Sequence, residues 1–352
     1  LVDGQPDGKV KAELGDGETG WSFSFRLYNL SAADRTYTLD ASMLTTDTVT
    51  AEAEGKTYNL SADQMAALGA ELTYTGEAVA DGRVTVPAGG SAQVKVEIQI
   101  PAKAVEHMKA LGYANGFYVE GFVYVRPEAD AEGALDVTHS IPVLGWYGNW
   151  TDPSMFDTGS YLEYAYGTLQ RPSHINTNVK NAMTWCPKGY GAGLYYTGNI
   201  YGSYSESTGL VGDQHYYPER NALSTRPESQ WQFYALFPTL IRNATDVEVR
   251  ITDADTGKLY YVNDYETFDD YMMASFYYTN AGQWYDTTSD YGVGFDWDYV
   301  DPETGETIPE GTRIRFSLLC APDYYINDDG SVRWDDLGKG ASLSYEFTVD
   351  NT

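Results

Sequence analysis

The chain has 352 residues, of which 42% are hydrophobic and 14% aromatic, and its formal net charge is -29. A single core rarely fills a chain of this length, so we expect two domains. The negative charge repels phosphate backbones and anionic lipid headgroups, so nucleic acid and membrane surfaces are not expected partners. No apolar run reaches the roughly 18 residues of a membrane helix, so no membrane insertion is expected.

The ends of the chain and its cysteines bear on where the protein works. The opening LVDGQPDGKV lacks the charged and apolar regions of a signal peptide. Because neither end carries a terminal signature, we expect an excised fragment of a longer protein. The two cysteines, Cys186 and Cys320, are too few for a disulfide framework, and their spacing does not reveal whether they pair.

Residues 1–150 contain several runs in which apolar and polar residues alternate, as is typical of half-buried strands. These runs are GWSFSFRLYN (20–29), RTYTLDASML (35–44) and QVKVEIQI (93–100), and NGFYVEGFVYV (115–125) also has strand character. Turns are predicted at ADGR (80–83) and PAGG (87–90). Two stretches, SADQMAALGA from residue 61 and AKAVEHMKALG from residue 102, instead favour short helices ended by glycine. About seven strands predict a β-sandwich of the immunoglobulin or fibronectin type III kind.

The composition changes after residue 150, since 23 of the 31 tyrosines lie there. The stretch GYGAGLYYTGNIYGSYSESTG (189–209) has no sustained period and predicts a long surface loop. Strands are predicted at QFYALFPTLIRN, VEVRITD, KLYYVND, TRIRFSLLC and LSYEFTVD, with turns at DADTGK (253–258), DPETGE (301–306) and NDDGS (327–331). A short helix is expected within 264–285. Residues 151–352 are therefore predicted to form a second β-sandwich with long Tyr/Gly-rich insertions.

Two Asp-Thr-Gly motifs, at 157–159 and 255–257, invite comparison with aspartic proteases, which share one proton between two carboxylates. The second motif lies in ITDADTGKLYY, whose polar centre between alternating strands predicts a hairpin turn instead. Asp253, Asp255 and Gly257 also imitate the opening of a calcium loop, but the glutamate expected at position 12 is Asp264. We therefore expect no catalytic residue and no metal or cofactor site here.

The histidines do not suggest catalysis. His107, His139, His174 and His215 lack the sequence contexts of a serine-protease triad, and no Gly-Thr-Ser-Met or Gly-x-Ser-x-Gly nucleophile turn occurs. His215 lies near Asp213 and Glu219, which is a weak metal signal.

Two aromatic groups are candidates for binding or for packing. Tyr190, Tyr195, Tyr196, Tyr201 and Tyr204 could stack on sugar rings or fill the gap between domains. The stretch IPVLGWYGNW (141–150) fits the last strand of the first sandwich, with Pro142 at its start or on an edge strand, and with Gly145 and Gly148 allowing close backbone approach. Its Trp146, Tyr147 and Trp150 are predicted to be largely buried at the joint between the two sandwiches.

Several stretches together resemble a known family. YNLSAADRTYTLDA, VTVPAGGSAQVKVEIQIP, NGFYVEGFVYV and IPVLGWYGNW resemble, in this order, the fibronectin type III-like domain that follows the catalytic domain in cell-envelope subtilisin-family proteases of the lactocepin and streptococcal complement-peptidase type. LIRNATDVEVRITDADTGKLYY and IPEGTRIRFSLLCAPDYY are similar to the next sandwich. Many relatives have a Ser-Pro-Asn-Gly-Asp-Gly-like turn where this chain has STRPES (224–229), so no cation role is carried over.

The resemblance implies a non-catalytic accessory segment of a secreted, cell-envelope serine endopeptidase. Such a segment would buttress the protease domain of the same polypeptide, space it from the cell surface and contribute a site for protein substrates. The chain itself is expected not to be an enzyme. The alternative is a free-standing extracellular adhesin or glycan-binding module that uses the tyrosines of 189–217.

Overall fold

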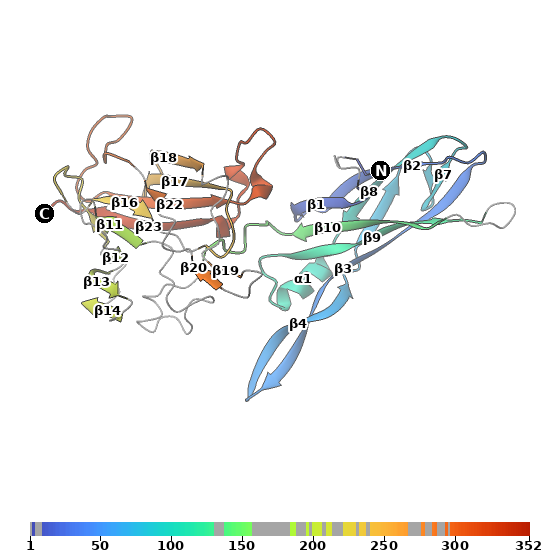
Figure 1. The fold of residues 1–352 in the computed structure, drawn as a ribbon, viewed down its shortest axis with the longest axis horizontal. Coiled ribbons are helices and arrows are strands. Elements are labelled where there is room, and N and C mark those ends of the chain that lie inside the picture. The colour runs from blue at the N-terminus through green and yellow to red at the C-terminus, as the bar shows by residue number, and fades with distance from the viewer. Residues whose placement is uncertain are drawn as a thin grey trace. The chain divides into compact units, whose positions relative to one another are not determined.

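The computed structural model of the chain describes residues 2–3, 9–129, 137–156, 184–187, 195–196, 199–205, 209–212, 221–229, 232–236, 240–266, 276–278, 284–286, 293–294 and 296–352. It divides into two compact units, Leu1–Trp150 and Thr151–Thr352. Each unit is built from β-sheets, which confirms the predicted all-β sandwich class (Figure 1). Within these ranges no helix has the length and apolar character needed to cross a membrane.

The first unit pairs a seven-stranded sheet with a three-stranded one. The larger sheet has the order β1-β10-β9-β3-β7-β6 with β4 attached to β3, and the smaller has the order β2-β8-β5. The strands are β1 (Ala12–Gly17), β2 (Trp21–Tyr28), β3 (Arg35–Ala53), β4 (Lys56–Ala67), β5 (Glu71–Thr75), β6 (Val79–Ala80), β7 (Arg83–Val86), β8 (Ser91–Gln99), β9 (Phe117–Pro127) and β10 (His139–Tyr147). Neighbouring strands are antiparallel except β1 and β10, which are parallel.

Alternating side chains from both sheets fill the core of the first unit. In β8, Val94, Val96 and Ile98 are fully buried, and the residues between them are exposed or half-buried. In β9, Val119, Val123 and Val125 are likewise fully buried and join the same cluster. Each such side chain contributes about 1.5–3 kcal/mol when it leaves water. The predicted strands at 20–29, 35–44, 93–100 and 115–125 are thus confirmed, with Asp81 and Gly82 in left-handed conformation at the predicted turn.

The second predicted helix is also confirmed. It is α1 (Ala102–Ala110), which follows Pro101 and ends before Gly112, whose φ is 103°. Val105 and Met108, three residues apart and so on one face, are buried against the first unit's core.

The helix expected from residue 61 is wrong, because residues 56–67 form β4. Glu54 and Gly55 make a tight turn with φ values of 50° and 71°, and from there β4 pairs back along β3 as far as Leu44. A long ladder of backbone hydrogen bonds outweighs the weak helix propensity of this stretch. Beyond Leu44, β3 pairs only with β4, and Figure 1 shows this two-stranded arm extending past the other strands of its unit.

The second unit contains a five-stranded sheet, β15-β23-β22-β17-β18, a six-stranded sheet, β14-β13-β12-β11-β16-β21, and the pair β19-β20. The strands are β11 (Thr184–Pro187), β12 (Tyr195–Tyr196), β13 (Asn199–Ser205), β14 (Gly209–Gly212), β15 (Ala222–Leu223), β16 (Phe233–Leu236), β17 (Asp246–Asp253), β18 (Leu259–Glu266), β19 (Phe276–Tyr278), β20 (Trp284–Asp286), β21 (Val293–Gly294), β22 (Arg313–Ala321) and β23 (Ser342–Val349). Among the described residues of this unit, short 3-10 helices lie at Asp323–Tyr325, Trp334–Asp336 and Lys339–Ala341.

The core of the second unit lies on one side of its five-stranded sheet. In β22, Ile314, Phe316, Leu318 and Cys320 are fully buried, and the residues between them face away. Alternating residues of β17 and β23 join the same cluster, together with residues from the connecting segments. The strands predicted at VEVRITD, KLYYVND, TRIRFSLLC and LSYEFTVD are therefore confirmed, as are the turns at 301–306 and 327–331. The stretch QFYALFPTLIRN forms a strand only at Phe233–Leu236, with an isolated bridge at Leu240, and residues 237–239 lie outside the description.

One expectation for the second half needs correction, and another falls largely outside the described residues. The stretch 189–209 is predicted to be a loop, but it contains all of β12 and β13 and the first residue of β14. Tyrosine and small residues suit a pleated strand even where they show no clear alternation. In 264–285 the described parts belong to β18, β19 and β20, so no helix occurs in them, and residues 267–275 lie outside the description.

Substitution of Gly121 should destabilise the first unit. A Cβ atom at this position of β9 would lie 1.9 Å from the carbonyl oxygen of Ser42 in the neighbouring β3, so the two strands would have to separate. We expect Gly121→Ala to lower the free energy of unfolding by about 3 kcal/mol in urea titrations followed by tryptophan fluorescence. Gly89→Ala, where the Cβ meets open space at φ 63°, should cost about 1 kcal/mol. Equal losses of stability for Gly121→Ala and Gly89→Ala would contradict the close approach of Gly121 to the Ser42 carbonyl oxygen.

Candidate functional site

The second Asp-Thr-Gly motif lies in the hairpin turn between β17 and β18, as predicted. The carboxylate of Asp253 accepts the backbone N–H groups of Asp255 at 3.0 Å and Thr256 at 2.7 Å. The N–H of Gly257, whose φ is 76°, donates to the Asp253 carbonyl at 2.9 Å. The first motif, at 157–159, lies outside the described residues. Asp255 therefore belongs to a turn, and among the described residues its carboxylate is paired with Arg313.

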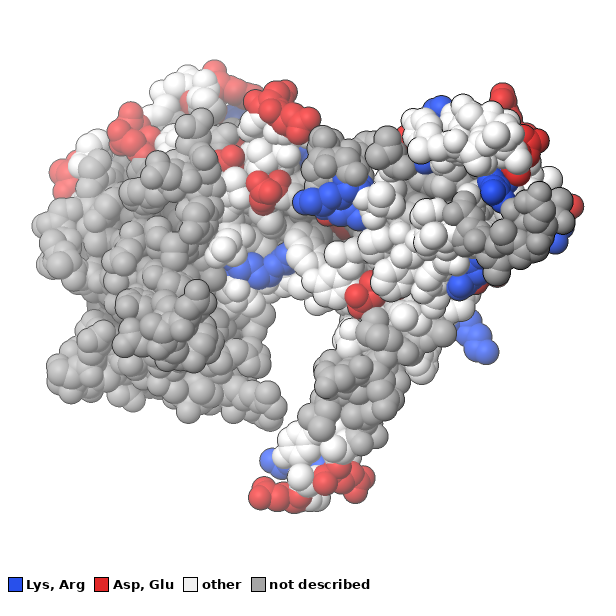
Figure 2. All heavy atoms as spheres, turned by 45° about the vertical axis from the view of Figure 1, so that its right-hand side comes forward, with Lys and Arg blue, Asp and Glu red and all other residues white. Residues whose placement is uncertain are grey.

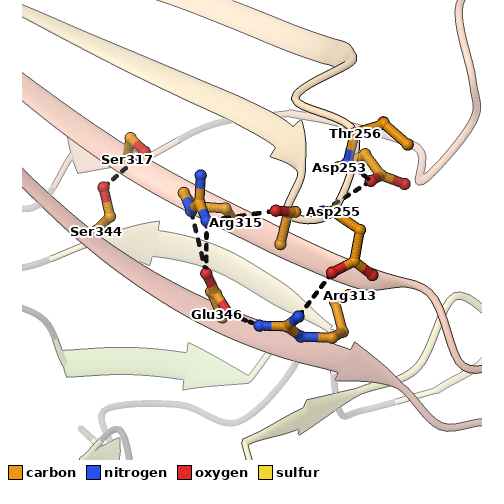
Figure 3. Close-up of polar contacts among 9 residues, drawn as sticks. Asp253, Asp255, Thr256, Arg313, Arg315, Ser317, Ser344 and Glu346 are labelled. Atoms are coloured by element: carbon orange, nitrogen blue, oxygen red, sulfur yellow. Dashed lines mark hydrogen bonds and ion pairs between the residues drawn. The ribbon is translucent and has the colours of Figure 1, made fainter.

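The same turn is connected to an ionic network on the outer side of the five-stranded sheet (Figure 3). Arg313 Nη1 donates to the Asp255 carboxylate at 2.6 Å and Nη2 to Glu346. Arg315 Nη2 donates to the other oxygen of Glu346 at 2.8 Å. Two guanidinium groups thus meet two carboxylates. Because each charge already has a partner, the network suits cross-strand stabilisation better than ligand binding.

Hydrogen bonding lowers the pKa of five carboxyls among the described residues of this unit, those of Asp253, Asp301, Asp329, Glu346 and Asp350. The pKa of Glu346 is lowered mainly by the side chain of Arg315, and that of Asp253 by the backbone N–H of Thr256. The pKa of Asp301 is lowered by Lys258, whose Nζ lies 2.6 Å from its carboxylate. Each shift has a structural cause within a turn or between strands, and none marks a catalytic acid.

The described histidines do not form a metal or catalytic site. His107 lies on α1 and His139 at the start of β10, and both are exposed. Within the ranges given above, no group of three or more His, Cys, Asp or Glu side chains could hold a metal ion. His174 and His215, with Asp213 and Glu219, lie outside the described residues.

The tyrosines and cysteines of the second half are only partly placed. Tyr195 and Tyr196 belong to β12, and Tyr201 and Tyr204 to β13, while Tyr190 and the side chains of all five lie outside the description. The thiol of Cys320 is free and fully buried, and burial raises its pKa, which makes it unreactive. The side chain of Cys186, in β11, lies outside the description.

The aromatic residues that end β10 point to opposite sides of the sheet. Tyr147 stacks on Phe117 with ring centroids 5.0 Å apart. Trp146 meets Tyr118 edge to face at 4.9 Å and Trp150 at 5.1 Å. All three residues predicted to be largely buried are instead half-buried, and these contacts lie within the first unit.

Glycines make room for this cluster, as predicted for Gly145 and Gly148. A Cβ at Gly145 would lie 3.1 Å from Leu14 Cβ, and one at Gly148 3.1 Å from Gly116 Cα. Pro142 lies near the start of β10, one residue before the pairing with β1 begins at Val143. However, β10 is not an edge strand, because it lies between β1 and β9.

Next to this cluster lies an exposed apolar surface, which we call the outer face. It consists of Tyr118, Glu120 and Phe122 of β9 with Pro142, Leu144 and Trp146 of β10, paired in register across the two strands. Tyr118, Phe122 and Leu144 are 42%, 41% and 48% exposed, so three large apolar side chains of one surface meet water. An apolar patch on a sheet is typical of a binding surface.

One end of the outer face has a polar border. Tyr124 lies 6.0 Å from Phe122 between ring centroids, and the Arg126 guanidinium lies 4.4 Å above the Tyr124 ring. Arg126 is also 3.2 Å from the Asp40 carboxylate. Sequence reasoning missed the outer face, although NGFYVEGFVYV is apolar at both alternating sets of positions, which indicates a strand with two apolar sides.

Figure 2 shows acidic and basic side chains of the described residues in small separate groups, with wide uncharged areas between them.

Comparison with known proteins places these observations in a family context. Residues 12–144 match the family model of an Fn3-like domain. The PI-type proteinase of Lactococcus lactis subsp. cremoris is 23% identical over 273 residues, which is 73% of this chain and 12% of that protein. The PII-type proteinase of Lacticaseibacillus paracasei is 24% identical over 246 residues, which is 66% of this chain and 11% of that protein.

These matches confirm the resemblance expected from the sequence. Since the alignment with the first proteinase covers 73% of the chain, it must extend beyond the 150 residues of the first unit. The chain spans only a small part of the length of either proteinase. Among solved structures, the periplasmic chaperone SfaE aligns over 97% of this chain and 98% of its own, with 10% identity and a TM-score of 0.25, which is too low to support any argument.

The lowered pKa values predict loss of stability in acid. A carboxyl whose pKa is lower in the folded than in the unfolded state stabilises the fold above its unfolded pKa, and this contribution disappears as the pH falls through the folded pKa. We expect the free energy of unfolding to fall from about pH 5 downwards. Glu346→Gln should reduce this dependence by up to about 1 kcal/mol, the value of a solvent-accessible ion pair. Glu228→Gln, at an exposed position, should follow the wild type; identical curves for all three proteins would refute the assignment.

Removal of Trp146 should weaken the first unit. Trp146→Ala deletes the edge-to-face contacts with Tyr118 and Trp150 and uncovers Gly116, so we expect a loss of about 2 kcal/mol, less than for a fully buried tryptophan. Urea unfolding measured by circular dichroism tests this. Tyr28→Ala, at a side chain that is 58% exposed, should change stability by less than about 0.5 kcal/mol. Unchanged stability of Trp146→Ala would show that the cluster is dispensable for folding.

Proposed function

We propose that this chain is a non-catalytic accessory segment of a secreted, cell-envelope subtilisin-like serine endopeptidase. The observation that carries the proposal is the extent of the similarity: most of the chain aligns with proteinases, yet it covers only 11–12% of their length. The aligned part includes an Fn3-like sandwich. A β-sandwich of this kind is a scaffold, and its function depends on the surfaces it presents.

The chemistry of the chain supports an accessory role. The sequence contains no Gly-Thr-Ser-Met or Gly-x-Ser-x-Gly turn that would present a serine nucleophile. Asp255 is held by a hairpin turn and by Arg313. Catalysis would then belong to a separate domain of the same polypeptide, outside the cell and associated with the cell wall.

Two tasks fit such a segment. Its sandwiches would buttress the protease domain and space it from the cell surface, since sheets closed by well-packed cores are stiff. It would also offer protein substrates a binding surface outside the catalytic cleft. Surfaces of this type raise the local concentration of a substrate and so increase the rate of its cleavage without taking part in the chemistry.

Deletion of residues 1–352 from the parent polypeptide tests the proposal. We expect kcat/KM for a folded protein substrate to fall about tenfold, mainly through KM, because remote contacts contribute uniform binding. Cleavage of a short chromogenic peptide, which reaches only the catalytic cleft, should change less than twofold. The purified chain alone should cleave neither substrate. Turnover by the purified chain, or a parent polypeptide without a protease domain, would refute the proposal.

A further inference from the structure

Glu120 occupies the centre of the outer face and has apolar neighbours on the same side of the sheet. It lies opposite Leu144 of β10 and opposite Leu44 of β3. Tyr118 and Phe122 flank it along β9, since residues two apart in a strand share a face. Glu120 as a whole residue is half-buried at this position.

Among the described residues, the carboxylate of Glu120 makes no hydrogen bond and no ion pair. Two strands away on the same side of the sheet, Lys11 pairs with Glu13 at 2.6 Å. Along β9 itself, the next basic residue on this side is Arg126, about 20 Å away. Arg126 is already engaged by Asp40 and Tyr124. This differs from the network of the second unit, in which Glu346 meets two arginines.

A carboxylate that has apolar neighbours and no partner favours binding of a cation that is itself flanked by apolar groups. Neighbouring apolar side chains displace part of its water, so a cation gains more there than at an open surface. The aromatic rings of Tyr118 and Phe122 on either side also attract cations through their faces. The exposed apolar side chains around the carboxylate can pack against apolar residues that flank the cation in a polypeptide.

We propose that the outer face binds a polypeptide segment in which a lysine or arginine is flanked by apolar side chains. The cation pairs with Glu120, and the flanking side chains cover Phe122 and Leu144. The net charge of -29 attracts a cationic partner and steers its approach. The same charge opposes pairing of the outer face with a second copy of the chain. This inference rests on the contacts of the first unit and does not depend on the proposed function.

Binding of synthetic peptides to the complete chain tests the proposal. The probe is a short peptide with a central lysine between leucine and phenylalanine, and its partner peptide carries acetyl-lysine at that position. Binding is followed by titration calorimetry, and by intrinsic tryptophan fluorescence, to which Trp146 of the outer face contributes. We expect acetylation and Glu120→Gln each to weaken binding about tenfold, and their combination to add little, because both remove the same pair.

Matched variants distinguish the ion pair between Glu120 and the peptide lysine from the general attraction of the negatively charged chain for a cationic peptide. Glu71→Gln removes an equal charge from an exposed position of β5 and should leave binding unchanged. Leu144→Ser should weaken both peptides equally, because it removes apolar contact only. Equal losses for Glu120→Gln and Glu71→Gln, or equal affinities for lysine and acetyl-lysine, would overturn the proposal. So would a dimer in sedimentation that Leu144→Ser dissociates. Acetylation of the peptide tests the pair even if Glu120→Gln fails to fold.

Discussion

The alternation of side chains along β9 is the constraint on which the first unit depends. This strand lies between β10 and β3 and sends Val119, Val123 and Val125 into the core. Because the period of a strand is two, the same register leaves Tyr118, Glu120 and Phe122 on the opposite side. The register of β9 therefore determines both which side chains form the core and which form the outer face. A shift of β9 by a single residue would exchange them, so whatever holds the register also holds the exposed surface in place.

The two units treat their charged side chains differently. On the outer side of the second unit's five-stranded sheet, Arg313 and Arg315 form ion pairs with Glu346 and Asp255. Each of these four charges has an oppositely charged partner. On the first unit's sheet, a carboxylate is left without a partner among apolar side chains. Ion pairs between neighbouring strands are explained by the stability that they add to the sheet, without a role in binding. An unmatched carboxylate has a cost within the free protein, and such a cost is understandable where a partner supplies the missing charge.

Local patterns in the sequence predicted local structure well. The alternation of residues 20–29 predicted β2, and the polar centre of 253–258 predicted the turn that contains Asp255. The failures involve partners distant in sequence. Residues 61–67 pair with β3 against their own weak preference, and the meeting of Arg313 with Glu346 depends on the register of β22 with β23. The outer face was missed for the same reason, since only pairing across strands shows that Glu120 lies opposite both Leu44 and Leu144.

The buried thiol of Cys320 can serve as a chemical probe of how often the second unit opens. A thiol reagent can reach this sulfur when β22 leaves the core, and the raised pKa keeps the protonated, slow-reacting form dominant until then. The rate of alkylation therefore reports how often this unit opens, one molecule at a time and without denaturant. Since Cys186 is the other cysteine of the chain, replacing it with serine leaves a single reporter. The opening of one sandwich can then be timed while the other remains folded.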